Sequence, residues 1–84
     1  MSRTLSREEA DTVVRTALRG FASDAELAAL PRTEPLRAAL DLDSLDFLTF
    51  IEKLTRATEV RIDEADYARM ESIDSCVDFL TAVE

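Results

Sequence analysis

The spacing of apolar residues in two stretches is the feature that most restricts the fold of this chain. In residues 6–21, apolar side chains recur at every third and fourth position, which places them on one face of an α-helix. The stretch opens with Ser6-x-x-Glu9, a pattern whose side chains cap the backbone N–H groups of a helix start. We therefore predict a helix over about 6–21. Its apolar face comprises Ala10, Val13, Val14, Ala17, Leu18 and Phe21.

The second stretch begins at Asp43-Ser44-Leu45 and predicts a helix over about 43–57. Asp43 suits the N-cap, because its carboxylate can accept from first-turn N–H groups that lack helical partners. Ser44 then lies on the surface, in the first turn. At about 100° per residue, Leu45 points away from the buried face. That face comprises Phe47, Phe50, Ile51, Leu54 and Thr58.

The rest of the chain predicts shorter helices. Residues 22–43 form a long structured connection, with helical turns expected over about 23–30 and 33–40. A short third helix is predicted over about 63–70, and a last helix over about 72–82. Leucines should fix the connection to the bundle: Leu27, Leu30, Leu36 and Leu40. The last helix should bury Ile73, Cys76, Val77, Leu80 and Val83, with Phe79 at the edge.

The length of 84 residues predicts one domain over residues 1–84. A single glycine, two prolines and few aromatic residues favour an all-α fold. We expect a small bundle of three main helices plus a short third helix, with the long loop between the first two main helices. No apolar run approaches the roughly 20 residues of a membrane span, and no signal peptide is evident, so we expect a cytoplasmic monomer.

Histidine is absent and Cys76 is the single cysteine, which excludes intramolecular disulfides, Cys/His zinc sites and catalytic pairs that use histidine. We expect Cys76 to be a small buried hydrophobic residue rather than a reactive thiol. Asp41, Asp43 and Glu52 have the spacing of EF-hand ligands. That reading fails because Leu45 replaces a ligand and Asp46 replaces the glycine of the turn. No metal site is predicted.

The net charge of −8 argues against nucleic acids and anionic membrane surfaces as partners. Residues 1–40 are neutral, with six acids and six arginines. Residues 41–62 carry −2, whereas residues 63–84 carry −6 from seven acids and one arginine. A basic partner should therefore be attracted mainly to the C-terminal half.

The sequence Leu42-Asp43-Ser44-Leu45-Asp46 resembles the phosphopantetheine attachment motif of acyl carrier proteins, in which Asp-Ser-Leu opens the second helix. The similarity continues through Val60-x-Ile62 and an acidic short helix to Ser72-Ile73 and Val77-Asp78-Phe79-Leu80. It covers residues 40–82 closely, and the first helix and long loop by pattern.

The resemblance implies that the chain is not an enzyme. A separate magnesium-dependent phosphopantetheinyl transferase would attach the arm of coenzyme A to Ser44 as a phosphodiester, beside Asp43. The thiol of the arm would carry acyl groups as thioesters for fatty-acid, lipid or polyketide-type biosynthesis. Its other partners would be acyl-loading and acyl-processing enzymes. In this family the acyl chain can enter a cavity between the helices, and the matching positions are Phe50, Ile51, Leu54, Ile62, Tyr67, Met70, Ile73 and Cys76.

Two departures from the family pattern affect the expected partners. Asp41 replaces a glycine that usually stands two residues before the motif's aspartate, which predicts a less flexible loop. The second helix, usually rich in glutamate on its outer face, carries Lys53 and Arg56 there. We therefore expect a specialised carrier for a dedicated pathway, with primary metabolism left open. The expected partner-binding residues are Leu45, Asp46, Leu48, Glu52, Asp63, Glu64 and Asp66.

Two alternative functions stay open. The chain could carry aminoacyl or peptidyl groups, although aminoacyl carriers often place histidine where Asp43 precedes Ser44. It could also be a helical protein-interaction module of the same fold that never receives the arm.

Overall fold

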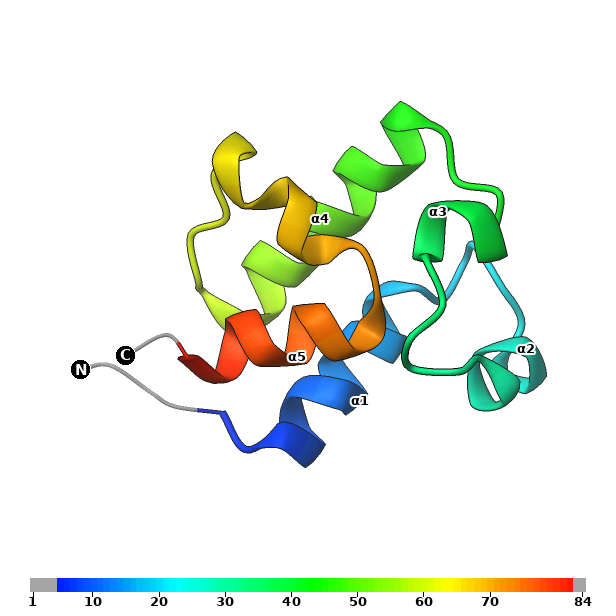
Figure 1. Ribbon diagram of the computed structural model, residues 1–84, viewed down its shortest axis with the longest axis horizontal. Helices are drawn as coiled ribbons and strands as arrows, with labels where there is room; N and C mark the ends of the chain where they lie inside the picture. The colour runs from blue at the N-terminus through cyan, green and yellow to red at the C-terminus, as the bar shows by residue number, and fades with distance from the viewer. Residues whose placement is uncertain (1–4, 83–84) are drawn as a thin grey trace.

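Three longer helices, α1 (Arg7–Ala17), α4 (Ser44–Thr58) and α5 (Ile73–Ala82), surround the hydrophobic core in a computed structural model that describes residues 5–82 (Figure 1). Helix α1 packs against both α4 and α5, and the 3₁₀ helix η1 (Glu64–Met70) packs against α5. Two short helices, α2 (Asp24–Ala29) and α3 (Leu36–Ala39), lie in the connection between α1 and α4. The described residues contain no β-strand, which confirms the predicted all-α fold.

Local sequence signals account for three helix starts. Ser6 with Glu9, Ser23 with Glu26, and Asp43 with Asp46 each form a capping box, in which each side chain accepts from the other residue's backbone N–H. Hydrogen bonds from the backbone and the side chain of Ser23 lower the pKa of the exposed Glu26 carboxyl. These contacts involve residues three apart, so they form wherever the backbone turns into a helix.

Helix α1 ends at Ala17, four residues before the predicted end at Phe21. The reason is Gly20, whose φ of +101° lies in the left-handed region that stops a helix. Lys53 of α4 donates from Nζ to the Arg19 carbonyl at 3.1 Å and lies 5.0 Å from the centre of the Phe21 ring. Phe21 therefore leaves the helix but stays packed against the core.

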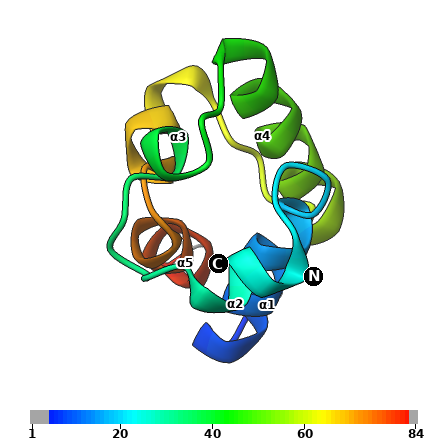
Figure 2. The same cartoon turned by 90° about the vertical axis from the view of Figure 1, so that its right-hand side faces the viewer.

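The connection between α1 and α4 covers one end of the bundle (Figure 2). Leu27 and Leu36 are buried, and Leu30 and Leu40 pack partly against the core, as predicted. Backbone hydrogen bonds also hold the connection: Leu36 N–H donates to the Glu71 carbonyl at 2.7 Å, and Asp74 N–H donates to the Arg32 carbonyl at 3.0 Å. The long loop is therefore anchored to the junction of η1 and α5.

The predicted buried faces of the helices form the core. Val60 and Ile62 pack partly against it from the segment between α4 and η1. Phe79, predicted at the edge of the last helix, is buried with only 7% of its surface exposed. Val83, predicted to be buried, lies outside the described residues. Within residues 5–82, the helices are too short or too polar to cross a membrane.

We expect Leu45→Ala and Leu54→Ala to differ sharply in stability, although both lie on α4. Leu45 is 73% exposed, whereas Leu54 is fully buried. Truncating Leu54 should lower the free energy of unfolding by about 2–5 kcal/mol, because it leaves a cavity. Truncating Leu45 should change it by less than about 0.5 kcal/mol. Urea denaturation of both variants is the measurement, and equal losses would contradict the assigned helix face.

Candidate functional site

The start of α4 is held by a reciprocal pair of hydrogen bonds. Asp46 N–H donates to Asp43 Oδ1 at 2.8 Å, and Asp43 N–H donates to Asp46 Oδ2 at 3.3 Å. This confirms Asp43 as the N-cap. Both carboxylates accept from backbone N–H groups, and these bonds fix the geometry of the helix start. Ser44 is the first residue of the helix.

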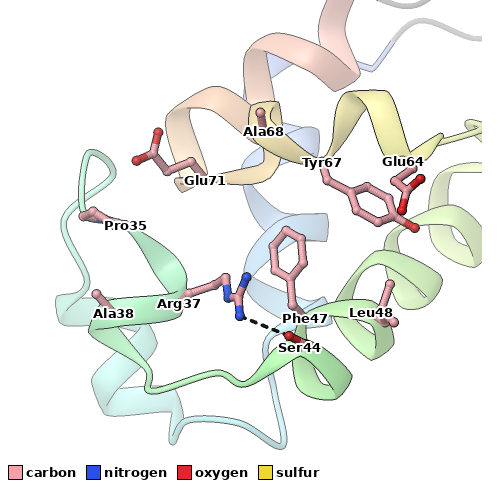
Figure 3. A pocket seen from close by; sticks show the side chains of 10 residues that line it. All are labelled: Pro35, Arg37, Ala38, Ser44, Phe47, Leu48, Glu64, Tyr67, Ala68 and Glu71. Carbon is pink, nitrogen blue, oxygen red and sulfur yellow. Dashed lines mark hydrogen bonds between the residues drawn. The ribbon is translucent and has the colours of Figure 1, made fainter.

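Ser44 is exposed at this helix start and faces α3 (Figure 3). Arg37 of α3 donates from Nη2 to Ser44 Oγ in a long hydrogen bond of 3.4 Å. The position of Arg37 follows from its neighbours, since Leu36 is fully buried and its N–H is bound to Glu71. The Arg37 carbonyl in turn accepts from Leu42 N–H at 2.9 Å, which closes the loop from α3 to α4.

Asp41 lies in this loop with a φ of +54°, in the left-handed region. Glycine adopts that conformation without strain, and aspartate tolerates it better than most residues because of its short polar side chain. In the family that the sequence resembles, this position is usually glycine. In this chain its backbone likewise requires a residue that accepts a left-handed conformation.

A surface pocket of about 620 Å³ opens beside Ser44, between α3, α4 and η1 (Figure 3). The ring of Phe47 stands between Arg37 and Tyr67. The Arg37 guanidinium carbon lies 5.5 Å from the centre of the Phe47 ring, and the Phe47 and Tyr67 rings meet edge to face at 5.9 Å. The lining residues are Pro35, Arg37, Ala38, Ser44, Phe47, Leu48, Glu64, Tyr67, Ala68 and Glu71.

The predicted acyl-cavity residues are divided between this pocket and the core. Tyr67 lines the pocket, and Ile62 is half-buried. The others are buried in the core and do not line this pocket: Phe50, Ile51, Leu54, Met70, Ile73 and Cys76. The prediction missed Phe47 and Arg37 as pocket residues. Phe47 had a signal, because it follows Ser44 by three positions and so lies one helical turn along α4.

Cys76 is fully buried, and its sulfur lies 3.8 Å from Met70 Sδ. Burial raises the pKa of the Cys76 thiol to about 12, because desolvation disfavours the thiolate. The side chain thus behaves as a small apolar residue at neutral pH, as predicted. Among residues 5–82, acidic and cysteine side chains form no cluster suited to a metal ion.

The predicted partner-binding residues of α4 differ in exposure. Leu45, Leu48 and Glu52 are exposed, and Leu48 also lines the pocket. Asp46 is half-buried, and its carboxylate accepts from Asp43 N–H in the helix cap. Lys53 is exposed, and its ammonium group donates to the Arg19 carbonyl beyond the end of α1. Its place on or near the partner-facing side stays a prediction.

The predicted acidic residues around η1 also differ in their contacts. Asp63 pairs with Arg61 at 2.9 Å, and its N–H donates to Asp66 Oδ2 at 3.1 Å. Glu64 lines the pocket beside Ser44. Asp63 and Asp66 thus hold the start of η1, whereas Glu64 contributes charge to the rim of the pocket.

Comparison with known proteins gives one match. The profile of a family described as "phosphopantetheine attachment site" matches residues 14–80 of the chain. No curated protein matches it. No solved structure matches it either.

We expect Asp41→Val to lower the free energy of unfolding by about 1–2 kcal/mol, because a β-branched side chain is strained in the left-handed region. Asp41→Asn is the matched control. It removes the same charge, keeps the tolerance for this conformation, and should change stability by less than about 0.5 kcal/mol. Urea denaturation of both variants tests this. Equal losses would show that the charge of Asp41, and not its backbone conformation, matters.

Proposed function

The chain belongs to the phosphopantetheine attachment site family, and from that premise we propose that Ser44 carries the arm. Carrier domains of this family hold a covalently attached phosphopantetheine group and are not enzymes. Since the domain itself does no chemistry, its function depends on an accessible hydroxyl, a surface that partner enzymes recognise, and space for the cargo.

The exposed position of the Ser44 hydroxyl at the first residue of α4 carries this proposal. A transferase can reach it without unfolding the domain. The surroundings also suit the group, because the Arg37 cation lies beside the oxygen that would bear the phosphate, and a pocket opens next to it. An anionic phosphodiester and a long, partly apolar arm both find complementary groups there.

The attachment reaction needs coenzyme A and a separate magnesium-dependent transferase. The Ser44 oxygen forms a bond to the phosphorus atom that bears the pantetheine, and the P–O bond of the pyrophosphate breaks. Adenosine 3′,5′-bisphosphate leaves, and the hydroxyl proton passes to a base of the transferase. Within this chain, the Asp43–Asp46 pair holds the serine at the head of α4 during the transfer.

Once attached, the arm supplies a terminal thiol that can hold a cargo as a thioester. We propose that this cargo is an acyl group and that the pocket beside Ser44 shelters part of it. The apolar and aromatic side chains of Phe47, Leu48 and Tyr67 support this assignment. We also propose that the predicted acyl-cavity residues in the core can receive the acyl chain. The chain could reach them only if α4 and η1 separated.

We further propose that the carrier serves a dedicated biosynthetic pathway. The exposed side of α4 carries Glu52 and Arg56 one turn apart, so their charges offset each other. Partners that need a strongly acidic helix would gain little from this surface. The alternatives are an aminoacyl or peptidyl carrier and an unmodified interaction module. The loading experiment below separates the last of these, because only a carrier gains the mass of the arm.

We expect Ser44→Ala to fold normally and to accept no arm. Intact mass spectrometry after incubation with a phosphopantetheinyl transferase, coenzyme A and Mg²⁺ measures the modification. Ser23→Ala is the matched control, since it removes another exposed hydroxyl from a helix start. It should lose about 1 kcal/mol of stability with its cap but should still gain the mass of the arm. A mass gain by the Ser44→Ala protein would exclude Ser44 as the sole attachment site.

We expect partner docking to depend more on the acids around η1 than on Glu52. Replacing Asp63, Glu64 and Asp66 together by lysine should slow association with the transferase, most at low salt, where the Debye length is about 30 Å at 0.01 M. Because Asp63 and Asp66 also hold the start of η1, Glu64→Lys alone is the cleaner variant.

Glu52→Lys is the matched control for this charge reversal, because Glu52 is also exposed and lies on α4. Association rates measured against salt concentration compare the two single variants. A larger loss of rate in Glu52→Lys than in Glu64→Lys would show that α4 directs docking, contrary to our proposal.

A further inference from the structure

Arg37 stands beside the proposed attachment oxygen, and we propose that it binds the phosphodiester of the arm and so fixes the arm's first atoms against the pocket. This inference rests on the proposed function of Ser44. It concerns the Arg37 guanidinium, whose Nη2 already lies 3.4 Å from Ser44 Oγ.

Ion pairing sets Arg37 apart from most arginines of the domain. Five arginines in residues 5–82 pair with carboxylates: Arg7, Arg15, Arg19, Arg32 and Arg61. Within the same residues, Arg37 has no carboxylate partner and instead contacts a neutral hydroxyl and the face of an aromatic ring. A cation held beside a modifiable hydroxyl, without a counter-charge, is suited to an anion bonded to that hydroxyl.

The anion needs such a cation because its other neighbours are acidic. Asp43 directly precedes Ser44, and Asp46 follows it by two positions. Their carboxylates accept from backbone N–H groups, so they stay in place when a negative phosphate arrives. Arg37 is the one basic residue among the ten that line the pocket, so it would supply the opposing charge.

The backbone of Arg37 is held in place before any anion binds. Its neighbour Leu36 is fully buried and bonded to Glu71, and its own carbonyl accepts from Leu42 N–H. The Phe47 ring restricts the guanidinium from one side, at 5.5 Å. A planar guanidinium presents paired N–H donors that match two phosphate oxygens, and this pre-ordering reduces the side-chain entropy lost on binding.

The present contacts of Arg37 do little for the fold itself. The side chain is exposed, and its bond to Ser44 is near the upper limit of hydrogen-bond length. Arg37→Gln should therefore fold, which allows the apo and the arm-bearing forms to be compared in the same variant.

The experiment compares the apo chain with the chain loaded by a phosphopantetheinyl transferase, coenzyme A and Mg²⁺, with loading verified by intact mass. In the wild type, the Nε–Hε NMR signal of Arg37 should shift on loading. The Nε–Hε signal of Arg69 should not shift. Arg69 is the matched control, because it also lies over an aromatic ring, that of Phe79 at 4.9 Å, and does not line the pocket.

Thermal unfolding provides the second measurement. The change in midpoint on loading should be more favourable in the wild type than in Arg37→Gln by about 2–5 °C at low salt. This is the size expected of an exposed charge pair in a small domain. Arg37→Lys should retain part of this difference, since it keeps the charge but not the planar donors. Arg69→Gln should behave as the wild type. High salt should reduce the difference.

The outcomes separate this inference from the proposed function. If the wild type gains the mass of the arm but Arg37 shows neither a signal shift nor an effect on the midpoint, Arg37 does not bind the phosphodiester and the attachment at Ser44 stands. If the wild type gains no mass under these conditions, both proposals are overturned. Both proposals are supported if the Arg37 signal shifts on loading and the stabilisation that loading gives the wild type is lost in Arg37→Gln.

Discussion

The hydrogen bond from Leu36 N–H to the Glu71 carbonyl, at 2.7 Å, is the contact on which the site depends most. It joins the connection after α1 to the end of η1, and the bond from Asp74 N–H to the Arg32 carbonyl repeats this link. A helix as short as α3 is not stable by itself, because few backbone bonds offset its ordering. Tertiary anchoring therefore keeps α3 helical and places it beside the start of α4.

The pocket follows from this anchoring. Its walls come from α3, α4 and η1. The face of Phe47 lies against the cation of Arg37, and the Phe47 and Tyr67 rings meet edge to face. The Ser44 hydroxyl lies at this junction, whereas the fully buried side chains lie behind it in the core. An exposed hydroxyl and a recess lined by aromatic and charged side chains thus lie side by side on the surface.

Charge in this domain is divided between structural and exposed roles. Asp43 and Asp46 cap α4, and Asp63 pairs with Arg61. Lys53, although basic and on α4, is bound to the carbonyl of Arg19. Glu52 and Glu64 are exposed and take no part in these contacts.

Local sequence determined the three longer helices and the position of Ser44 at the start of α4. Capping pairs three residues apart and apolar periodicity depend on contacts within one helix, which is why α1, α4 and α5 were predictable. The end of α1 ahead of Gly20 and the left-handed conformation of Asp41 were predictable only in part. The pocket was decided by tertiary structure alone. Arg37, Ser44 and Tyr67 meet because backbone bonds join segments far apart in the sequence, and no local pattern records which side chains such bonds bring together.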